Sequence, residues 1–577
     1  MLNPKIANAL SRTADLLEID GADGFRINSY RRAGRTIKEA TEDVAKLAAE
    51  NRLTELPGIG KGTAGRIQQI IETGSMDVLD ELEAKLPQGL PALLEIPGMG
   101  PKKVALAFHQ LNVAGLDDLK RVIASGEFAA LPGLGATSVK KIAEGIAFLE
   151  SSGDRTPLGI AWPIAEALAQ RLRELDGVKR VEIAGSIRRG VETIGDVDLL
   201  CEAKDGKTVI GAFTSFDGVK RVLAEGKTKG SVTVSLEKDR ELQIDLRVVD
   251  RESFGAALQY FTGSKEHNVR LRESAVRKKW RLNEYGLFDD KKSIAGKNEE
   301  EIYARLGFPW VPPELREDRG ELKSDAPLPE LITLDDIRGD LHVHTTASDG
   351  RNSIAEMAHA AKGRGYKFLA ICDHSKSSVI AGGLSIERME KHIRAIRKVA
   401  EELRGFDLLV GCECDILPNG SLDYPDEILA QCDWVVASIH SAMGKGGARK
   451  LSPTDRTIAA MENRYVCAIG HPTGRLINRR APMELDMATV VEAAARTGTF
   501  LEINASWQRL DLKDLHVRQA LDAGVTLTIN TDAHSVDGLA AMRYGIKTAR
   551  RGGATQTNTV NALTPAALRK RIAAKRQ

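Results

Sequence analysis

Residues 185–198, Gly-Ser-Ile-Arg-Arg-Gly-Val-Glu-Thr-Ile-Gly-Asp-Val-Asp, carry the pattern that organises the first half of the chain. Asp196 and Asp198 are two residues apart, and the apolar residues Val197 and Leu199-Leu200 predict a β-strand there. Side chains at i and i+2 of a strand point to the same face, so the two carboxylates lie side by side. Their repulsion has to be offset by cations, and paired divalent ions about 3.5–4 Å apart suit in-line phosphoryl transfer.

The residues before this carboxylate pair are suited to a polyphosphate. The turn at Gly185-Ser186 offers backbone N–H groups and a hydroxyl, and Arg188-Arg189 offers guanidinium groups. A third carboxylate, Asp245, lies in another strand-like run, residues 242–246. An Asp-x-Asp sequence by itself is more often an exposed turn, but together with the arginines, Gly195 and the third carboxylate it favours a metal-dependent phosphoryl-transfer site.

Residues 185–198 closely resemble the nucleotidyltransferase signature of the X-family DNA polymerases, the family of polymerase beta. The resemblance continues at residues 260–264 (Tyr-Phe-Thr-Gly-Ser) and 283–285 (Asn-Glu-Tyr) and covers roughly residues 1–320. It implies that two Mg²⁺ or Mn²⁺ ions are held by the catalytic residues Asp196, Asp198 and Asp245. It also implies a nucleotide pocket for dNTPs, in which an aromatic pair disfavours a ribose, formed by Gly185, Ser186, Arg189, Gly195, Tyr260, Phe261, Gly263 and Asn268.

Two positions depart from the polymerase beta pattern. Lys265 stands where that polymerase has an acid, and Gln243 replaces an arginine two residues before the third aspartate. We therefore expect fidelity and efficiency to differ, although the carboxylate set is intact.

Arg272 falls where the family contacts the minor groove or the incoming base. Lys227 and Lys229 are expected to contact template phosphates, and a solvated basic turn is the alternative.

Residues 1–150 contain three copies of one short element. The copies are Leu-Pro-Gly-Ile-Gly at 56–60, Ile-Pro-Gly-Met-Gly at 96–100 and Leu-Pro-Gly-Leu-Gly at 131–135. The glycines permit a tight turn, and the N-terminus of the helix that follows offers free N–H groups to a phosphate. The element resembles the helix-hairpin-helix motif, which grips the sugar-phosphate backbone without reading sequence. Plain turns between helices are the alternative for one copy, and three copies favour DNA contacts at Gly58, Gly60, Gly98, Gly100, Gly133 and Gly135.

Bulk charge does not indicate DNA binding. Residues 1–150 contain 18 Lys and Arg against 20 Asp and Glu, and the whole chain has a net charge of +2. Any DNA contact there has to depend on local geometry.

Residues 25–33 also resemble the small N-terminal domain of polymerase beta, and the alignment places Arg66 where that family has its lyase lysine. An arginine stays protonated and forms no Schiff base, which argues against sugar-phosphate lyase activity.

From Asp340 onward, apolar runs alternate with amphipathic helices, a rhythm typical of a parallel α/β barrel. Nearly every run ends in an imidazole or a carboxylate, and the strand ends of such a barrel converge on one mouth. A single His or Asp at a strand end is most often structural. Nine at successive strand ends, including six of the 11 histidines, favour a metal centre made of His342, His344, Asp349, His374, Glu413, His440, His471, Asp532 and His534.

These nine residues resemble the ligand set of the PHP family, named for polymerases and histidinol phosphatases. Mixed imidazole and carboxylate ligands suit Mn²⁺, Zn²⁺ or Fe²⁺, and nine ligands suggest three ions. The chemistry implied is phosphoester hydrolysis. A polymerase core followed by a PHP domain resembles the bacterial X-family polymerases. For these the family implies gap filling in base excision repair, with 3′→5′ exonuclease and in some members abasic-site endonuclease or 3′-phosphatase activity.

The expected fold is therefore multidomain: an all-α helix-hairpin-helix region, an α+β palm and thumb, and a C-terminal α/β PHP barrel, distorted from the TIM type. A length of 577 residues is too great for one core. The predicted parts are residues 1–80 (N-terminal helical DNA-binding domain), 81–150 (second helical domain), 151–250 (palm), 251–318 (nucleotide-selecting subdomain), 319–337 (linker) and 338–577 (PHP domain).

The sequence has no apolar run of about 20 residues and no signal-like start, so no membrane span is expected. Its six scattered cysteines suit a reducing cytoplasm. The expected partners are gapped or nicked DNA with its 3′ ends and dNTPs, bound by a monomer at the bacterial nucleoid. Two alternatives remain: a small-molecule phosphatase carried on a DNA-binding scaffold, and a non-catalytic DNA clamp.

Overall fold

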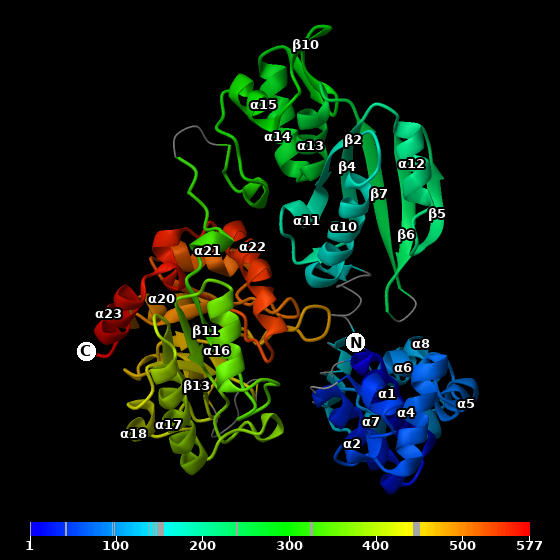
Figure 1. The fold of residues 1–577 in the computed structure, drawn as a ribbon, viewed down its shortest axis with the longest axis vertical. Helices are drawn as coiled ribbons and strands as arrows, with labels where there is room; N and C mark the ends of the chain where they lie inside the picture. The colour runs from blue at the N-terminus through cyan, green and yellow to red at the C-terminus, as the bar shows by residue number, and fades with distance from the viewer. Residues whose placement is uncertain are drawn as a thin grey trace. The chain divides into compact units, whose positions relative to one another are not determined.

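The computed structural model divides the chain into two compact units, Met1–Gly153 with Asn478–Ala481, and Asp154–Ile477 with Pro482–Gln577 (Figure 1). Pro97 of the second predicted hairpin, the predicted boundary at 150/151 and residues 323–326 of the predicted linker lie outside the described residues. The residues that the structure describes are 2–40, 43–94, 96, 98–136, 138–140, 142–143, 145–146, 155–237, 240–322, 327–441, 443 and 451–577.

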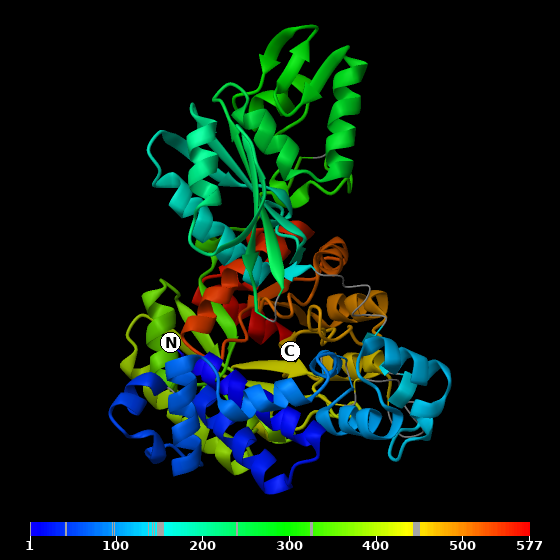
Figure 2. The same cartoon turned by 90° about the vertical axis from the view of Figure 1, so that its right-hand side faces the viewer.

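The regular elements described within residues 2–146 of the first unit are helices, as the blue elements of Figures 1 and 2 show. A core of Ile, Leu and Val side chains, among them Ile6, Leu10 and Leu17, holds its helices together. Its elements are α1 (Asn3–Asp20), α2 (Gly24–Glu39), α3 (Val44–Ala49), η1 (Leu53–Glu55), α4 (Lys61–Thr73), α5 (Asp77–Lys85), α6 (Leu90–Leu93), α7 (Pro101–Leu111), α8 (Leu116–Ala124) and η2 (Glu127–Ala130).

The three predicted hairpins share one backbone geometry. In each, the residue before the second glycine donates its N–H to the carbonyl three residues earlier, at 3.1, 2.9 and 3.0 Å in chain order. The first glycines, Gly58, Gly98 and Gly133, have φ of 79°, 89° and 76°, a left-handed conformation that favours glycine. The second glycines, Gly60 and Gly100, are the N-cap residues of α4 and α7.

A five-stranded sheet in the order β2-β4-β7-β6-β5 forms the palm region, residues 155–250. α10 and α12 pack on the face that carries Val197 and Leu199, whereas α13 packs near Leu200 on the opposite face (Figure 1). Strand alternation therefore puts Asp196 and Asp198 on the face of α13. The palm elements are β1 (Thr156–Pro157), α10 (Leu158–Arg173), β2 (Val178–Ile183), α11 (Gly185–Arg188), β3 (Thr193–Ile194), β4 (Asp196–Ala203), α12 (Gly206–Thr214), β5 (Val219–Glu225), β6 (Lys229–Ser235) and β7 (Glu241–Val249).

The thumb region, residues 251–322, is a small α+β subdomain with a three-stranded antiparallel sheet in the order β10-β9-β8. Its core includes Leu271, Ile302 and the buried Tyr303. Its elements are α13 (Phe254–Thr262), α14 (Lys265–Arg277), β8 (Trp280–Asn283), β9 (Gly286–Asp289), β10 (Lys292–Ala295), α15 (Glu299–Leu306) and η3 (Pro313–Leu315).

The barrel region, residues 327–577, is built on seven parallel strands in sequential order. The first and last strands meet where Val343 pairs with Ala533 and the His344 N–H donates to the Ala533 carbonyl at 2.9 Å. The barrel is therefore nearly closed, and the fold class predicted from the sequence is confirmed. The strands are β11 (Gly339–Val343), β12 (Phe368–Ile371), β13 (Asp407–Asp415), β14 (Trp434–Ser438), β15 (Ala468–Ile469), β16 (Phe500–Asn504) and β17 (Leu527–Asn530).

Helices cover the outside of this barrel, and α17 and α22 present apolar faces to it. Among the described helices, each is too short or too polar to cross a lipid bilayer. The helices and short turns of this region are η4 (Leu334–Asp336), α16 (Ile354–Gly363), η5 (Val379–Ala381), α17 (Ile386–Glu402), α18 (Asp426–Leu429), α19 (Pro453–Met461), α20 (Met487–Thr497), α21 (Asp514–Asp522), η6 (Asp537–Ala541), α22 (Met542–Gly552), η7 (Gln556–Asn558), η8 (Val560–Ala562) and α23 (Pro565–Lys575).

The segment predicted as a linker, residues 319–337, makes contacts with the flanking regions on both sides of the residues that lie outside the description, although several of its residues are exposed. Before residue 323, Arg319 donates to Asp514 of the barrel region at 3.0 Å, and Glu321 lies 2.7 Å from Nδ1 of His267 in the thumb region. After residue 326, Leu331 and Ile332 are buried. These contacts fix both described ends of the segment.

Candidate catalytic and metal sites

The three palm carboxylates come together because two strands run side by side. β4 and β7 are parallel neighbours, and their register places Asp198 opposite Asp245 and Asp196 opposite Gln243. A two-residue spacing along one strand and direct pairing across to the next bring all three carboxylates to one face. The structure thus assembles the trio that the sequence predicted.

Asp198 and Asp245 are half-buried, whereas Asp196 is exposed, and Asp198 has a perturbed pKa. Burial, together with the charges of Asp196 and Asp245, raises its pKa to about 7, although Arg247 and Arg189 oppose the shift. Three carboxylates brought to one face are a donor set for divalent cations, so Asp196, Asp198 and Asp245 fit the two ions that the family implies. Gly185 allows this crowding, because a Cβ there would lie 2.4 Å from Oδ2 of Asp198.

Asp245 is held in place by three neighbours that the sequence analysis did not assign to it. Ser231 Oγ donates to its Oδ1 at 2.5 Å, and Gln243 Nε2 donates to the same atom at 2.9 Å. Lys229 Nζ lies 3.6 Å from Oδ2. Lys229, predicted to contact template phosphates, thus lies beside a catalytic carboxylate in this structure, whereas Lys227 is exposed in the turn between β5 and β6.

A cavity of about 410 Å³ opens beside these carboxylates. Arg155 and Lys265, which the sequence analysis did not assign to the nucleotide, line this cavity together with most of the predicted nucleotide contacts. Gly195 lies against Arg155, since a Cβ on this glycine would be 3.1 Å from Nη1. The predicted residues that line the cavity are Gly185, Ser186, Arg189, Asp196, Asp198, Tyr260, Phe261, Gly263, Asn268 and Arg272.

The aromatic side of the cavity is fixed by hydrogen bonds. The rings of Tyr260 and Phe261 meet edge to face, with centroids 5.2 Å apart. Asn268 donates from Nδ2 to the Tyr260 carbonyl at 2.8 Å and accepts from Gln259 Nε2 at 2.6 Å. The side chain of Asn268 therefore holds the backbone of the aromatic pair.

The two arginines of the signature have different surroundings. Arg188 makes a bidentate pair with Glu299 of α15, with both N–O distances 2.8 Å, and so ties the palm region to the thumb region. Arg189 points to the cavity. Its Nε lies 3.0 Å from Glu317 Oε1, and its Nη1 donates to the Thr262 carbonyl at 2.5 Å.

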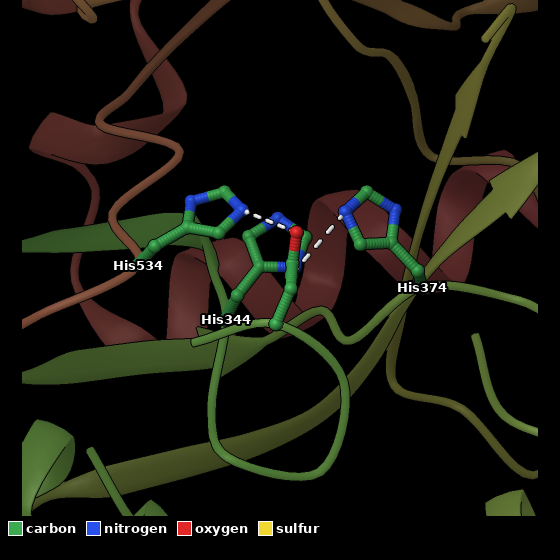
Figure 3. Close-up of side chains that lie close together, drawn as sticks. His344, His374 and His534 are labelled. Carbon is green, nitrogen blue, oxygen red and sulfur yellow. Dashed lines mark ion pairs between the residues drawn. The ribbon is translucent and has the colours of Figure 1, made fainter. Parts of the chain in front are cut away.

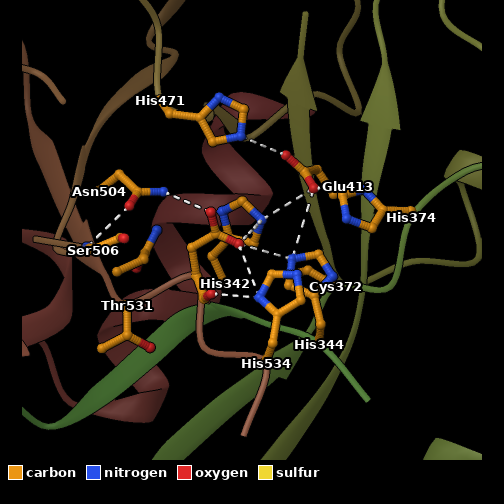
Figure 4. A network of polar contacts seen from close by, with 12 residues as sticks. His342, His344, Cys372, His374, Glu413, His471, Asn504, Ser506, Thr531 and His534 are labelled. Atoms are coloured by element: carbon orange, nitrogen blue, oxygen red, sulfur yellow. Dashed lines mark hydrogen bonds and ion pairs between the residues drawn. The ribbon is translucent and has the colours of Figure 1, made fainter. Parts of the chain in front are cut away.

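The second site lies in the barrel, where Glu413 stands among five imidazoles. Figure 4 shows four of them, those of His342, His344, His374 and His471. Its Oε1 is 2.9 Å from His471 Nε2 and 3.2 Å from His440 Nε2. Its Oε2 is 2.9 Å from His374 Nδ1, 3.5 Å from His342 Nε2 and 3.7 Å from His344 Nε2. These residues come from or just after five different strands, β11 to β15, whose ends meet at one mouth.

Two further carboxylates complete the set. Asp532 Oδ1 lies 3.0 Å from His344 Nε2. Asp349 contacts His534 and His374 at 3.3 and 3.6 Å, and the rings of these two histidines lie on either side of His344 (Figure 3). Their centroids are 4.2 and 4.4 Å from that of His344. All nine residues predicted from strand ends thus gather in one place.

His471 Nε2 and Glu413 Oε1 form a hydrogen bond, but several of the other close approaches are not hydrogen bonds. His374 Nδ1 and Glu413 Oε2 are 2.9 Å apart, yet both atoms lack a hydrogen-bond partner of acceptable geometry. Nε2 of His342, both ring nitrogens of His344 and Nδ1 of His471 are also buried without one. Buried polar atoms are normally satisfied, so lone pairs that converge without bonding fit cations between them. Three overlapping groups have this geometry: His344, Asp349, His374 and His534; His342, His344 and Asp532; and His374, Glu413 and His440.

The pKa values of the ring residues are shifted by burial and by the acids and bases that surround each of them. Burial raises the pKa of Glu413, but His440, His374 and His342 outweigh this and hold it well below its usual range. Burial lowers the pKa of His440, whereas Glu413 and Asp415 outweigh that effect and raise it to about 10. Burial and the charges of His534 and His374 lower the pKa of His344 to about 4. Neutral imidazole and ionised carboxylate are the forms that bind metals.

A second layer of acids and amides orients these ligands, and the sequence analysis missed it. Glu502 Oε1 lies 2.8 Å from His342 Nδ1, and its Oε2 accepts from the His471 N–H at 2.7 Å. Asp415 Oδ1 lies 2.5 Å from His440 Nδ1. Such partners fix the tautomer and raise the basicity of a ligating histidine. The alternation of side chains along a strand could have indicated Asp415 from the sequence. Asp415 is two residues after Glu413 on β13 and therefore lies on the same face.

Two members of the ring have unusual backbones. His471 has φ of 28° and Asp532 has φ of 53°, conformations that side-chain-bearing residues rarely adopt. Strain of this kind persists where the surrounding structure over-determines a residue, and it collects at functional sites. The mouth beside them is a cavity of about 510 Å³ whose lining includes Arg509, Ser377 and Ser378.

In the part of the lyase-like region that the structure describes, the position of the family's lyase lysine is occupied by an arginine. Arg66, at the position of the family's lyase lysine, lies with its guanidinium 5.5 Å from the Tyr30 ring centroid. Lys61, the first residue of α4, lines a separate cavity of about 540 Å³ with Asn51 and Gln68. The glycines predicted to contact DNA lie at the turns before α4, α7 and the helical residues after 135.

Comparisons with known proteins agree with this division of the chain. The family models for the DNA polymerase beta palm and thumb match residues 160–258 and 257–317, and the PHP domain model matches residues 340–506. Two helix-hairpin-helix models match residues 1–76 and 90–147. The DNA polymerase/3'-5' exonuclease PolX of Bacillus subtilis is 37% identical over 559 residues, covering 96% of this chain and 97% of that protein.

The chain belongs to the bacterial X-family DNA polymerases that carry a C-terminal PHP domain. Other relatives match this X-family polymerase only in part. A DNA polymerase lambda of Arabidopsis thaliana is 29% identical over 350 residues, covering 55% of this chain and 62% of that protein. A probable phosphatase of Thermoanaerobacter sp. (strain X514) is 27% identical over 230 residues, covering 38% of this chain and 89% of that protein.

Proposed function

We propose that this protein is a gap-filling DNA repair polymerase with its own 3′-end-processing phosphoesterase. The observation that carries the proposal is the presence of two separate donor sets, each suited to phosphoryl chemistry. One is the carboxylate trio beside the cavity of the palm region. The other is the imidazole and carboxylate ring at the barrel mouth.

In the polymerase site, Asp196 and Asp198 would hold both Mg²⁺ or Mn²⁺ ions. Asp245 would hold the catalytic ion and take the proton of the primer 3′-hydroxyl. The ions would neutralise charge on the phosphates and favour attack at the α-phosphorus. Ser186 and Arg189 lie where they can bind the dNTP triphosphate, and Tyr260 and Phe261 bound the sugar side of the cavity.

In the barrel site, the nine ring residues would hold three ions of Mn²⁺, Zn²⁺ or Fe²⁺. Bound ions would activate water and stabilise the leaving oxygen in hydrolysis of a 3′-terminal phosphodiester. The chain itself orients the ligands through Glu502 and Asp415, and Arg509, whose Nε lies 3.7 Å from Asp532, can bind a phosphate at the mouth. We infer 3′→5′ exonuclease activity, with action on abasic sites or 3′-phosphates as further substrates.

The N-terminal hairpins would bind the DNA backbone on the 5′ side of a gap. The three turn glycines with positive φ and the N–H groups of the following helices support this role. We propose that Lys227, Lys229 and Arg272 contact the duplex near the polymerase site. We further propose that the protein acts as a monomer in the cytoplasm, at the nucleoid, and that it has no sugar-phosphate lyase activity.

The test is a duplex with a one-nucleotide gap and a labelled primer, incubated with Mg²⁺ or Mn²⁺ with and without dNTPs. We expect extension by one nucleotide when dNTPs are present and shortening from the 3′ end when they are absent. Asp198→Ala should abolish extension and keep shortening, and His344→Ala should do the reverse. Loss of both activities in either variant would contradict the separation of the two sites.

A small-molecule phosphatase is the second candidate, because the barrel region matches probable phosphatases. Hydrolysis of histidinol phosphate without any shortening of a DNA 3′ end would favour it. The cavity beside the palm carboxylates argues against it, since a phosphatase carrier needs no second donor set.

A further inference from the structure

Three contacts join the signature turn of the polymerase site to one helix of the PHP domain. Lys547 Nζ of α22 donates to the Arg188 carbonyl at 3.3 Å, and Arg551 Nη1 donates to the Arg189 carbonyl at 2.9 Å. Gly190 packs against Lys547 so closely that a Cβ on the glycine would lie 3.0 Å from the Cβ of the lysine. The carbonyls at the end of α11 are thus capped by cations of a distant part of the chain.

The side chain of Arg189 is linked to the same helix through Glu317. Oε1 of Glu317 lies 3.0 Å from Nε of Arg189 and 2.7 Å from Nη1 of Arg551. Arg551 also pairs with Asp514 at 2.9 Å, and only 9% of its side chain is exposed. One carboxylate oxygen therefore bridges the triphosphate arginine and an arginine of the PHP domain.

This bridge affects both the position and the charge of Arg189. Glu317 and the Thr262 carbonyl use its Nε and Nη1, so the direction of the guanidinium toward the cavity is set before a nucleotide arrives. A carboxylate paired with Arg189 alone would cancel the charge that attracts phosphate. Because Arg551 shares Glu317, part of that negative charge is offset, and Arg189 retains attraction for an anion.

The helix that carries Arg551 has little freedom of its own. A Cβ on Gly545 would lie 2.6 Å from Ala505 and 2.7 Å from Ile529, and one on Gly552 would lie 2.1 Å from Val517. α22 therefore packs directly against the barrel region. This packing restricts the movement of the helix that carries Lys547 and Arg551.

We propose that Arg551 is a positioning residue of the polymerase site, which holds Arg189 toward the dNTP triphosphate through Glu317 and through the Arg189 carbonyl. By this proposal the PHP domain is a structural part of the nucleotide site, in addition to any hydrolysis it performs. The inference rests on the proposed polymerase function and adds a role for a residue of the other domain.

The experiment measures binding apart from turnover. Full-length protein on a one-nucleotide-gapped duplex is titrated with the α,β-imido analogue of the complementary dNTP and Mg²⁺, and insertion kinetics are measured in parallel. Arg551→Gln should raise the dissociation constant of the analogue and the KM for the dNTP at least about fivefold, the lower end of ordinary coupling between sites. Its kcat at saturating dNTP and its hydrolysis of bis(p-nitrophenyl) phosphate should stay within about twofold of wild type.

Matched variants separate positioning from general loosening. Arg543→Gln removes another contact between α22 and the palm region, the 2.9 Å pair with Glu166, which does not lead to Arg189, and should leave the dissociation constant unchanged. Arg551→Lys should restore part of the affinity. Glu317→Gln should also weaken binding, and the double variant Glu317→Gln/Arg551→Gln should be no weaker than the weaker single variant, because the two residues act in one relay.

Unchanged analogue binding by Arg551→Gln in an enzyme whose wild type inserts dNTPs would overturn this inference and leave the proposed function standing. So would an equal loss of binding in Arg543→Gln, or fully additive losses in the double variant. A wild-type protein that neither binds the analogue nor inserts a dNTP would overturn the proposed function and the inference with it.

Discussion

The two donor sets are built on opposite plans. The barrel ring draws its ligands from the ends of six of the seven strands, and a second layer that includes Glu502 and Asp415 holds their orientation. The palm trio comes from two neighbouring strands and borders an open cavity, and Asp196 is exposed. A nearly closed barrel can assemble a metal site before any ion arrives, whereas two strands that border an open cavity leave part of their site to be completed by the nucleotide.

The two sites also differ in how their surroundings shift the pKa of a central carboxylate. In the ring, imidazoles surround Glu413 and hold its pKa well below its usual range, so the carboxylate is ionised without a metal. In the palm, burial and neighbouring carboxylates raise the pKa of Asp198 to about 7. We therefore expect the ring to retain ions through dialysis and the palm to exchange them with each nucleotide. The predictions below test this contrast, from the largest effect to the smallest.

Glu413→Gln should break the ring and leave the palm intact. Removing the central charge leaves the surrounding histidines without their shared acid, so we expect metal content to fall and 3′-end hydrolysis to drop by at least about a thousandfold. Nucleotide insertion should stay within about twofold of wild type. Metal analysis of the dialysed protein and both activity assays check this.

Glu387→Gln is the control for that change. Glu387 lies on α17 of the same domain, is 77% exposed and pairs with Lys391 one helical turn away. It should behave like wild type in both assays. Full hydrolysis by Glu413→Gln would mean that the ring is not the hydrolytic site.

Glu314→Gln should test whether the thumb region, which carries Glu314, and the barrel region, which carries α22, unfold together. Glu314 is 3% exposed and pairs with Lys547 and Arg550 of α22 at 2.7 and 2.9 Å. Removing the charge of this buried carboxylate leaves two half-buried cations without their acid, so we expect a loss of about 3 kcal/mol in unfolding free energy. Glu166→Gln, in a pair whose carboxylate is 45% exposed, should cost at most about 1 kcal/mol.

The Glu314 effect should also depend on pH. Burial raises the pKa of Glu314, but Lys547 and Arg550 outweigh it and lower the pKa to about 2. A depressed folded-state pKa contributes stability that is complete above the ordinary value of about 4.5 and is lost as the pH falls toward 2. The stability difference between wild type and Glu314→Gln should therefore shrink over this window. A difference that stays constant down to pH 2 would contradict the assignment.

Metal binding at the palm should depend on pH near neutrality. Because Asp198 has a pKa of about 7 in the absence of cations, protons compete with the metal below that pH. The dissociation constant of Mn²⁺ at this site should rise about tenfold for each pH unit below 7 and level off above it. Mn²⁺ titrations of His344→Ala, in which the ring is disabled, would measure the palm site. A flat profile from pH 5.5 to 7 would contradict the proposed crowding of the carboxylates.

Ser231→Ala should give the smallest effect. Ser231 donates one hydrogen bond to Asp245, and the hydrogen bond from Gln243 remains in the variant. We expect kcat for insertion to fall by about threefold, in line with the loss of one hydrogen bond of about 0.5–1.5 kcal/mol. Thr233→Ala, on the same strand two residues away, serves as the control. Equal losses in both variants would show a general effect on β6.

Most of this comparison could be predicted from the sequence because both sites follow strand periodicity. Asp196 and Asp198 share a face by their spacing, and the nine ring residues mark strand ends that a parallel barrel must bring together. The second layer followed the same rule, since Asp415 lies two residues after Glu413, but no single residue type distinguishes an orienting acid from a ligand.

The long-range contacts could not be predicted. Arg189 and Glu317 are 128 residues apart, and Arg189 and Arg551 are 362 residues apart, so no local pattern connects them. The contact between Lys229 and Asp245 could not be predicted either, because it depends on the pairing of β6 with β7 and not on the local sequence. Packing of one domain against another depends on surfaces whose complementarity only the folded chain reveals.

The most direct test of the two-site account is anomalous scattering from crystals soaked in Mn²⁺. The account predicts a peak beside Asp196, Asp198 and Asp245, stronger when a dNTP analogue is present, and separate peaks within the ring around Glu413. Crystals with no peak at either place, or with Mn²⁺ bound only outside both sets of residues, would contradict it.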